Sequence, residues 1–213
     1  MTRVSLAVGV AVLLAGVTAT AQKISLMNPA AFKDEAPATY NVRFETSAGV
    51  FVAKVTRQWA PRAADRFYNL VKNGFYDGIR FHRVMPNFMA QFGIHTNPTV
   101  AGIWSRATFA PDPVKQSNKK MFLTFAMGGN PAMGSVQVFI NYRDNGNLDG
   151  QGFAPFGEIV EGQQVAAKLY DGYGDVRPRG KGPDNARMFK EGVGYLEKEF
   201  PKLDYIKTAT IQP

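Results

Sequence analysis

Cysteine is absent from the 213 residues of the chain. Its absence excludes structural disulfides, zinc sites built on cysteine and a cysteine nucleophile. It does not indicate a compartment, because proteins also fold without disulfides in oxidising compartments. Histidine is nearly as scarce: the chain has two, His82 and His95, and no Glu-x-x-His spacing surrounds them. We therefore predict no metal site, with His82 as a hydrogen-bonded structural residue and His95 as a loop residue.

Two further signatures of chemistry are missing. The pair Gly128-Gly129 is not followed by a Gly-Lys-Ser or Gly-Lys-Thr element, which disfavours a nucleotide-binding loop. No serine stands in a nucleophile elbow. The sequence therefore predicts no cofactor, and it favours a reaction that needs no acid, base or nucleophile.

Positive charge is in excess, with a formal net charge of +8 and 20% charged residues. The basic residues are scattered, and their densest groups are small, at Lys119-Lys120 and at 177–181. Nucleic-acid binding leaves a clustered basic patch, so we predict no nucleic-acid partner. Apolar residues make up 45% of the chain, enough for the core of one domain, which we expect to be a monomer.

The first 21 residues have the composition of a signal peptide. Arg3 is followed by an apolar run from Val4 to Val17, and Ala19-Thr20-Ala21 forms a small-x-small cleavage site. The run is shorter than the roughly 20 residues that span a bilayer. We predict a signal peptide at 1–21 and a periplasmic or secreted mature chain without stable membrane insertion. An uncleaved anchor is the alternative.

Apolar periodicity divides the rest into a flexible lead-in at 22–39 and one domain at 40–213. Strands are expected at 40–46, 50–56, 81–84, 122–127, 136–141, 156–160 and 205–211. Helices are expected at 61–73, 162–170 and 186–200, and a long loop at 93–120. Many short strands with two main helices far apart favour a closed antiparallel barrel over βαβ repeats.

Three ordered motifs carry a family resemblance. Residues 81–93 read Phe-His-Arg-Val-Met-Pro-Asn-Phe-Met-Ala-Gln-Phe-Gly, 137–140 read Gln-Val-Phe-Ile, and Leu148-Asp149-Gly150 precedes Phe156-Gly157. In these blocks, at near-family spacing, the chain resembles the cyclophilin family of peptidyl-prolyl cis-trans isomerases from Tyr40 to Ile211. The resemblance implies a mostly β fold, a closed eight-stranded antiparallel barrel capped by two α-helices.

The resemblance also implies a function and a site. Proline-containing polypeptides would be the substrates, and their X-Pro bonds would rotate without a covalent intermediate. The expected catalytic residues are Arg83, which would stabilise the twisted amide, and Gln91, which would orient the substrate or Arg83. The expected substrate-binding residues are Phe88, Met89, Met127, Gly128, Gln137, Phe139 and Leu148.

The sequence departs from the family at several positions. Phe92-Gly93 stands where Gly-Gly is frequent, and Asn147 replaces a tryptophan associated with cyclosporin binding, so we predict weakened inhibition by cyclosporin. A family histidine just after Leu-Asp-Gly is absent, which affects the expected peptide contacts on that side but not the central arginine.

Two other functions compete with catalysis. A non-catalytic proline-peptide-binding module or chaperone would bind the same segments but would not need the guanidinium of Arg83. A barrel that carries an apolar ligand would need a hollow interior, whereas Phe44, Phe81 and Phe125 indicate a filled one. The retained motif residues favour the isomerase.

Overall fold

A computed structural model describes residues 23, 25–129 and 131–212, so the predicted signal peptide at 1–21 lies outside the described residues. The eight strands of the sheet are β1 (Thr39–Thr46), β2 (Gly49–Thr56), β3 (Arg83–Met85), β4 (Met89–Phe92), β5 (Phe122–Gly128), β6 (Met133–Asn141), β7 (Pro155–Glu161) and β8 (Ile206–Gln212). The helices are α1 (Pro61–Lys72), α2 (Pro98–Arg106), α3 (Gln163–Ala166), α4 (Asn185–Glu191) and α5 (Val193–Glu199), with 3-10 turns η1 (Pro29–Ala31) and η2 (Gly146–Gln151).

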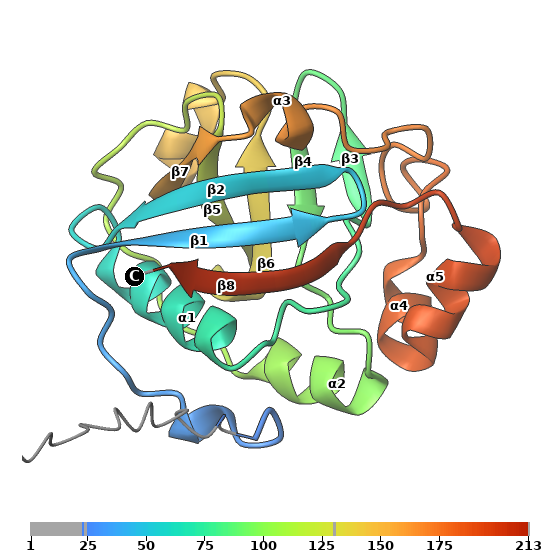
Figure 1. The fold of residues 1–213 in the computed structure, drawn as a ribbon, viewed down its shortest axis with the longest axis horizontal. Helices are drawn as coiled ribbons and strands as arrows, with labels where there is room; N and C mark the ends of the chain where they lie inside the picture. Colours follow the sequence, from blue (N-terminus) through green and yellow to red (C-terminus); the bar gives the residue numbers. More distant parts are fainter. Residues whose placement is uncertain (1–22, 24, 130, 213) are drawn as a thin grey trace, which may run out of the picture.

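The sheet is antiparallel throughout, in the order β3-β4-β6-β5-β7-β2-β1-β8. It curls into an open half-barrel with helices around it (Figure 1), which corrects the predicted closed barrel. Among the described residues, its end strands β3 and β8 do not pair with each other. The segment before β3 instead meets the start of β8, where the Ile206 N–H donates to the Ile79 carbonyl oxygen (2.9 Å) and Arg80 forms a bridge with Tyr205. The three residues of β3 follow this contact in the chain and pair with β4.

Most expected elements are confirmed, and the main differences fall in the helices. The helix expected at 162–170 is the single turn α3, and the helix expected at 186–200 is divided into α4 and α5 at Gly192. Gly192 has a φ of +65°, and a Cβ there would lie 2.4 Å from the Thr96 carbonyl oxygen, so the chain turns sharply where it approaches α2. Five α-helices replace the two expected caps among the described residues.

The helix α2 lies within the region expected to be a loop. Its start carries a readable signal, because the side chain of Asn97 accepts hydrogen bonds from the backbone N–H groups of Thr99 and Val100 (2.9 and 3.3 Å), and Pro98 occupies the first helical position. Its apolar pattern is too short to predict a helix, because the buried side chains are Val100, Ala101 and Trp104.

Aromatic rings fill the interior between α1 and the sheet. Phe67 on α1 is fully buried and lies 5.0 Å from the ring of Phe156 and 5.5 Å from that of Tyr76. Phe44 and Phe51 stack on neighbouring strands at 4.8 Å. This packing agrees with the filled interior expected from the phenylalanines and leaves the hollow-barrel alternative without support.

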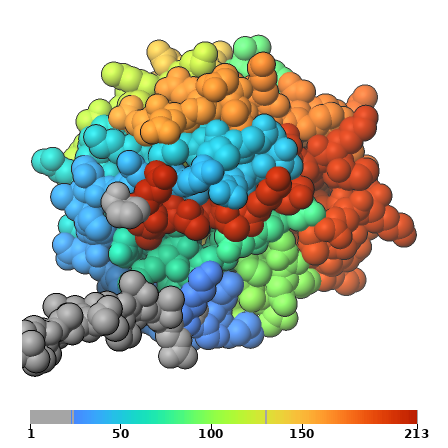
Figure 2. Space-filling view, in the orientation of Figure 1, coloured from blue at the N-terminus to red at the C-terminus, as the bar shows by residue number. Residues whose placement is uncertain are grey.

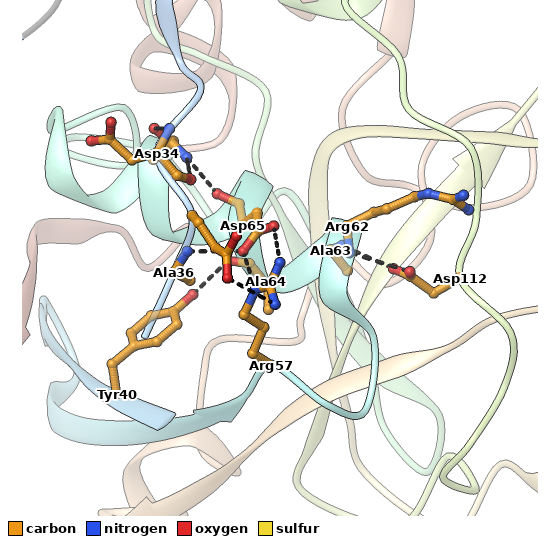
Figure 3. Close-up of polar contacts among 11 residues, drawn as sticks. Asp34, Ala36, Tyr40, Arg57, Arg62, Ala63, Ala64, Asp65 and Asp112 are labelled. Carbon is orange, nitrogen blue, oxygen red and sulfur yellow. Dashed lines mark hydrogen bonds and ion pairs between the residues drawn. The ribbon is translucent and has the colours of Figure 1, made fainter. Parts of the chain in front are cut away.

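The lead-in before β1 lies against the domain. The side chain of Asp65 on α1 accepts a hydrogen bond from the backbone N–H of Ala36 (2.9 Å), as Figure 3 shows. Phe32 packs edge-on against Trp104 of α2 at 4.8 Å, and Trp104 donates to the Leu26 carbonyl oxygen at 2.8 Å. The polar composition of 22–39 predicts a flexible segment instead, and the contacts are not visible in the sequence because their partners lie far away in the chain.

The N-terminus of α1 is capped by a distant carboxylate. Its N-cap residue Ala60 makes no side-chain cap, and instead buried Asp112 accepts hydrogen bonds from the backbone N–H groups of Arg62 (3.2 Å) and Ala63 (3.0 Å); Figure 3 shows the bond to Ala63. Asp112 thus satisfies two free helix donors and places negative charge at the positive end of the helix.

We expect Asp112→Ala to lower the free energy of unfolding by about 2 kcal/mol, because two N–H groups at the start of α1, one of them in a buried hydrogen bond, lose their acceptor. Chemical denaturation measures this change. Asp112→Asn, which keeps an oxygen but loses the charge, should cost about half as much. A loss below about 0.5 kcal/mol for Asp112→Ala would show that the cap contributes nothing beyond an ordinary surface contact.

Residues 171–203, which include α4 and α5, form a lobe at one side of the sheet (Figures 1 and 2). We call this segment the C-terminal lobe. It has a small apolar core of its own, which also includes Ile94 and Ala101 from outside the lobe: Ile94, Ala101, Val176, Met188, Tyr195, Leu196, Phe200 and Leu203. Among the described residues, no helix is long and apolar enough to cross a bilayer.

Candidate active site

Three neighbouring strands bring the motif residues side by side. In the sheet register, Arg83 on β3 lies opposite Gln91 on β4, and Gln91 lies opposite Phe139 on β6. Directly opposed residues of antiparallel strands project from the same face, so the three side chains share one surface. The turn between β3 and β4 is tight, with Asn87 at φ +59°, a conformation that asparagine tolerates.

A chain of side-chain hydrogen bonds runs across this surface. Arg83 donates from Nη1 to Oε1 of Gln91 at 3.2 Å, and Gln91 donates from Nε2 to Oε1 of Gln137 at 2.9 Å. Arg83 also donates from Nε to Oδ1 of Asp175 at 2.6 Å. Its side chain is 19% exposed, so the guanidinium is largely withdrawn from water but still reachable.

An apolar cavity of about 250 Å³ opens beside the guanidinium. Its floor is a separate buried cluster of Met89, Phe139 and Leu148, with Phe88 packed against it. The guanidinium carbon of Arg83 lies 5.8 Å from the centre of the Phe88 ring. The lining residues are His82, Arg83, Phe88, Met89, Gln91, Ala126, Met127, Phe139, Leu148, Phe153, Val176, Arg179 and Asn185.

A second hollow of about 410 Å³ adjoins the first and shares Gln91, Ala126, Met127 and Asn185 with it. Gln137 and Gly128 line this second hollow and not the first. All nine site residues expected from the sequence therefore lie around two adjoining hollows. One is apolar beside Arg83, and the other follows the end of β5.

Among the described residues that line the cavity, none carries a group suited to proton transfer near neutral pH. Burial and, to a smaller extent, the positive charge of Arg83 together lower the pKa of His82 to about 4. The imidazole is therefore neutral at pH 7, and its Nδ1 has no hydrogen-bond partner among the described residues. The site can bind and polarise a substrate through Arg83 and the two glutamines.

Sequence reasoning missed a buried polar network beneath the cavity. Asn145 donates to the Phe88 carbonyl oxygen (2.9 Å) and to Oδ1 of Asn141 (2.8 Å), and Asn118 donates to Oδ1 of Asp149 (2.7 Å). These bonds connect the backbone of Phe88 and the 3-10 turn that holds Leu148. The only signal was the density of asparagines at 141–147, which is also typical of a solvated loop.

The C-terminal lobe contributes residues that the motifs did not indicate. Val176, Arg179 and Asn185 line the cavity, and Asp175 contacts Arg83. The local sequence of 171–185 is rich in glycine and proline, and it does not indicate that these residues line the cavity beside Arg83. Their role is visible only once the lobe is folded against β3.

Comparisons with known proteins agree with this geometry. A family model described as "Cyclophilin type peptidyl-prolyl cis-trans isomerase/CLD" matches residues 41–187. A "Peptidyl-prolyl cis-trans isomerase" of Acinetobacter baylyi is 36% identical over 137 residues, covering 60% of this chain and 70% of that protein. "Peptidyl-prolyl cis-trans isomerase A" of Dickeya dadantii is 34% identical over 158 residues, covering 68% and 80%.

Solved structures share the fold. A cyclophilin-type isomerase from Cryptosporidium parvum has a TM-score of 0.58 at 17% identity, covering 82% of this chain and 98% of that one. A second structure of that protein, in the presence of the dipeptide Ala-Pro, has a TM-score of 0.57, also at 17% identity, covering 81% and 99%. A cyclophilin from Hirschia baltica has a TM-score of 0.56 at 19% identity, covering 83% and 75%. At these identities the likeness shows the fold alone.

Proposed function

The chain belongs to the cyclophilin-type peptidyl-prolyl cis-trans isomerases, and from this premise we propose that it rotates the X-Pro bonds of polypeptides in the cavity beside Arg83. The observation that carries the proposal is the guanidinium of Arg83, held by Gln91 at the edge of an apolar cavity. A related fold, that of the Cryptosporidium parvum protein, was determined in the presence of Ala-Pro, which supports a proline-containing substrate here.

The proposed chemistry is stabilisation of a twisted amide. Rotation about a peptide bond breaks amide resonance and crosses a barrier of about 18–20 kcal/mol. As the bond twists, the prolyl nitrogen becomes pyramidal and gains a lone pair, which an N–H of Arg83 stabilises. The planar ground state offers no such lone pair, so the interaction lowers the barrier selectively. No covalent intermediate forms, which fits a cavity without a nucleophile.

The other residues of the site would bind the substrate or orient Arg83. Met89, Phe139, Leu148 and Phe88 form the apolar surface against which the pyrrolidine ring would pack. Gln91 orients Arg83 through the hydrogen bond between them, and Gln137 extends the polar contacts toward the second hollow. Met127 and Gly128, at the end of β5, would hold the peptide along that hollow.

A protease-coupled assay with a chromogenic Ala-Pro peptide tests the proposal on the chain from Gln22. We expect the slow phase, which reports uncatalysed isomerisation over roughly tens of seconds, to accelerate in proportion to protein concentration. Folded protein that binds the peptide but leaves the slow phase unchanged would instead support the binding module or chaperone.

The proposed place of action is outside the cytoplasm, where the enzyme would assist protein folding. The support is the signal-peptide composition of residues 1–21. Mass spectrometry of the protein expressed in a bacterial host should find a chain that begins at Gln22 in the periplasm or medium. An intact Met1 in the cytoplasmic fraction would contradict it.

A further inference from the structure

We propose that Asp175, on the C-terminal lobe, is a positioning residue for Arg83. The inference rests on the proposed isomerase function, and it adds a second support for the guanidinium that none of the three motifs contains. Arg83 is then held from two sides, by Gln91 on β4 and by Asp175 on a segment 92 residues further along the chain.

The contact is a two-point ion pair. Arg83 donates from Nε to Oδ1 of Asp175 at 2.6 Å and from Nη2 to Oδ2 at 3.4 Å. The two side chains are 19% and 13% exposed, so the pair is shielded from water and salt. A fork of this kind fixes the plane of a guanidinium as well as its position.

The bonds leave donors for a substrate. A guanidinium has five N–H groups. One goes to Gln91 and two go to Asp175, so one N–H remains on each terminal nitrogen of Arg83. The carboxylate therefore occupies the Nε side of the guanidinium and does not exhaust the nitrogens that would face a prolyl nitrogen.

Asp175 is itself held firmly. Its Oδ1 accepts from the backbone N–H of Val176 (2.8 Å), its Oδ2 from Nε of Arg179 (3.1 Å), and its carbonyl oxygen from the N–H of Gly182 (2.8 Å). Burial alone would raise the pKa of Asp175, but the hydrogen bond and charge of Arg83, the N–H of Val176 and the charge of Arg179 outweigh it and lower the pKa below its usual value. The carboxylate is thus ionised at neutral pH.

The lobe anchors this carboxylate. Val176, the next residue, is 3% exposed and packs in the lobe's own core with Met188 and Tyr195. Val176 also lines the cavity beside Arg83. Because one short segment belongs to both the lobe core and the cavity wall, the packing of α4 and α5 fixes where Asp175 meets Arg83.

The test compares Asp175→Ala and Asp175→Asn with wild type in the peptide assay. We expect Asp175→Ala to lower kcat/KM about tenfold, mostly through kcat, because a misdirected guanidinium loses contact mainly in the twisted state. Asp175→Asn keeps one acceptor oxygen and should recover part of the rate. The Nε–H resonance of Arg83 in nitrogen-15 NMR should be sharp in wild type and exchange-broadened in Asp175→Ala.

Glu191→Gln is the matched control. It also removes one negative charge from the lobe, but Glu191 pairs with Arg187 on α4, away from the cavity, so kcat/KM should stay at the wild-type value. If Asp175→Ala does not fold, the test uses Asp175→Asn, for which we expect a smaller loss of kcat. An active wild type whose folded Asp175 variants match or exceed its rate overturns the positioning role alone. An inactive wild type overturns the proposed function as well.

Discussion

Replacement of Arg83 by alanine is expected to lower kcat/KM for an Ala-Pro peptide on the order of 100-fold, the loss typical of one electrostatic donor aimed at a transition state. The loss should fall on kcat, because Phe88, Met89, Phe139 and Leu148 still hold the proline ring. The protease-coupled assay gives the rates, and peptide titration followed by NMR gives the affinity.

Arg83→Lys is the matched variant. It keeps the positive charge but cannot form the fork to Asp175 and the bond to Gln91 together, so we expect an intermediate rate. Thermal unfolding should show that both variants are folded. An Arg83→Ala protein that keeps more than half of the wild-type kcat/KM would mean that the guanidinium is not the group that stabilises the twisted bond.

Gly93→Ala is expected to lower the free energy of unfolding by about 3 kcal/mol or more. Gly93 follows β4 at φ +118°, where side chains are strained, and a Cβ there would lie 2.4 Å from the Val136 carbonyl oxygen and 2.6 Å from the Gln137 Cα. Both obstacles are backbone atoms of β6, so the strand itself would have to move. That movement would shift Gln137 away from Gln91, and the activity should fall together with the stability.

Gly102→Ala is the control for this prediction. Gly102 lies inside α2, and apart from its chain neighbours and the backbone of its own helix no described atom lies within 4 Å of the position that its Cβ would take. The same change should therefore stabilise the protein by about 0.5–1 kcal/mol through helix propensity. Urea denaturation of both variants measures the contrast. Equal effects of the two substitutions would contradict the close approach of Gly93 to β6.

The candidate site residues whose neighbours could be predicted from the sequence are those whose partners lie near them in the chain or in a motif. Arg83 and Gln91 lie eight residues apart on a hairpin, so strand pairing alone places them opposite each other. Phe88 and Met89 lie within the same hairpin. The resemblance to a known family added Phe139 and Leu148, whose positions beside them depend on β6 and η2.

The residues that sequence missed depend on contacts between distant segments. Asp175 reaches Arg83 because a lobe with its own core packs against β3, and Asp112 caps a helix that begins 51 residues before it. In the sequence, Asn118 and Asn145 resemble asparagines of solvated loops, whereas in the structure they make hydrogen bonds inside the domain. The sheet also stays open between β3 and β8, and no apolar pattern reports which edge strands pair.

Exchange NMR on a labelled Ala-Pro peptide, with a small amount of the chain from Gln22, tests the central claim most directly, since it observes the bond rotation without a protease. Free peptide isomerises over roughly tens of seconds and should show no exchange peaks at short mixing times. Cross-peaks between the cis and trans resonances that appear with wild type and vanish with Arg83→Ala are the predicted result. Folded wild type that binds the peptide and produces no cross-peaks would contradict catalysis at this site.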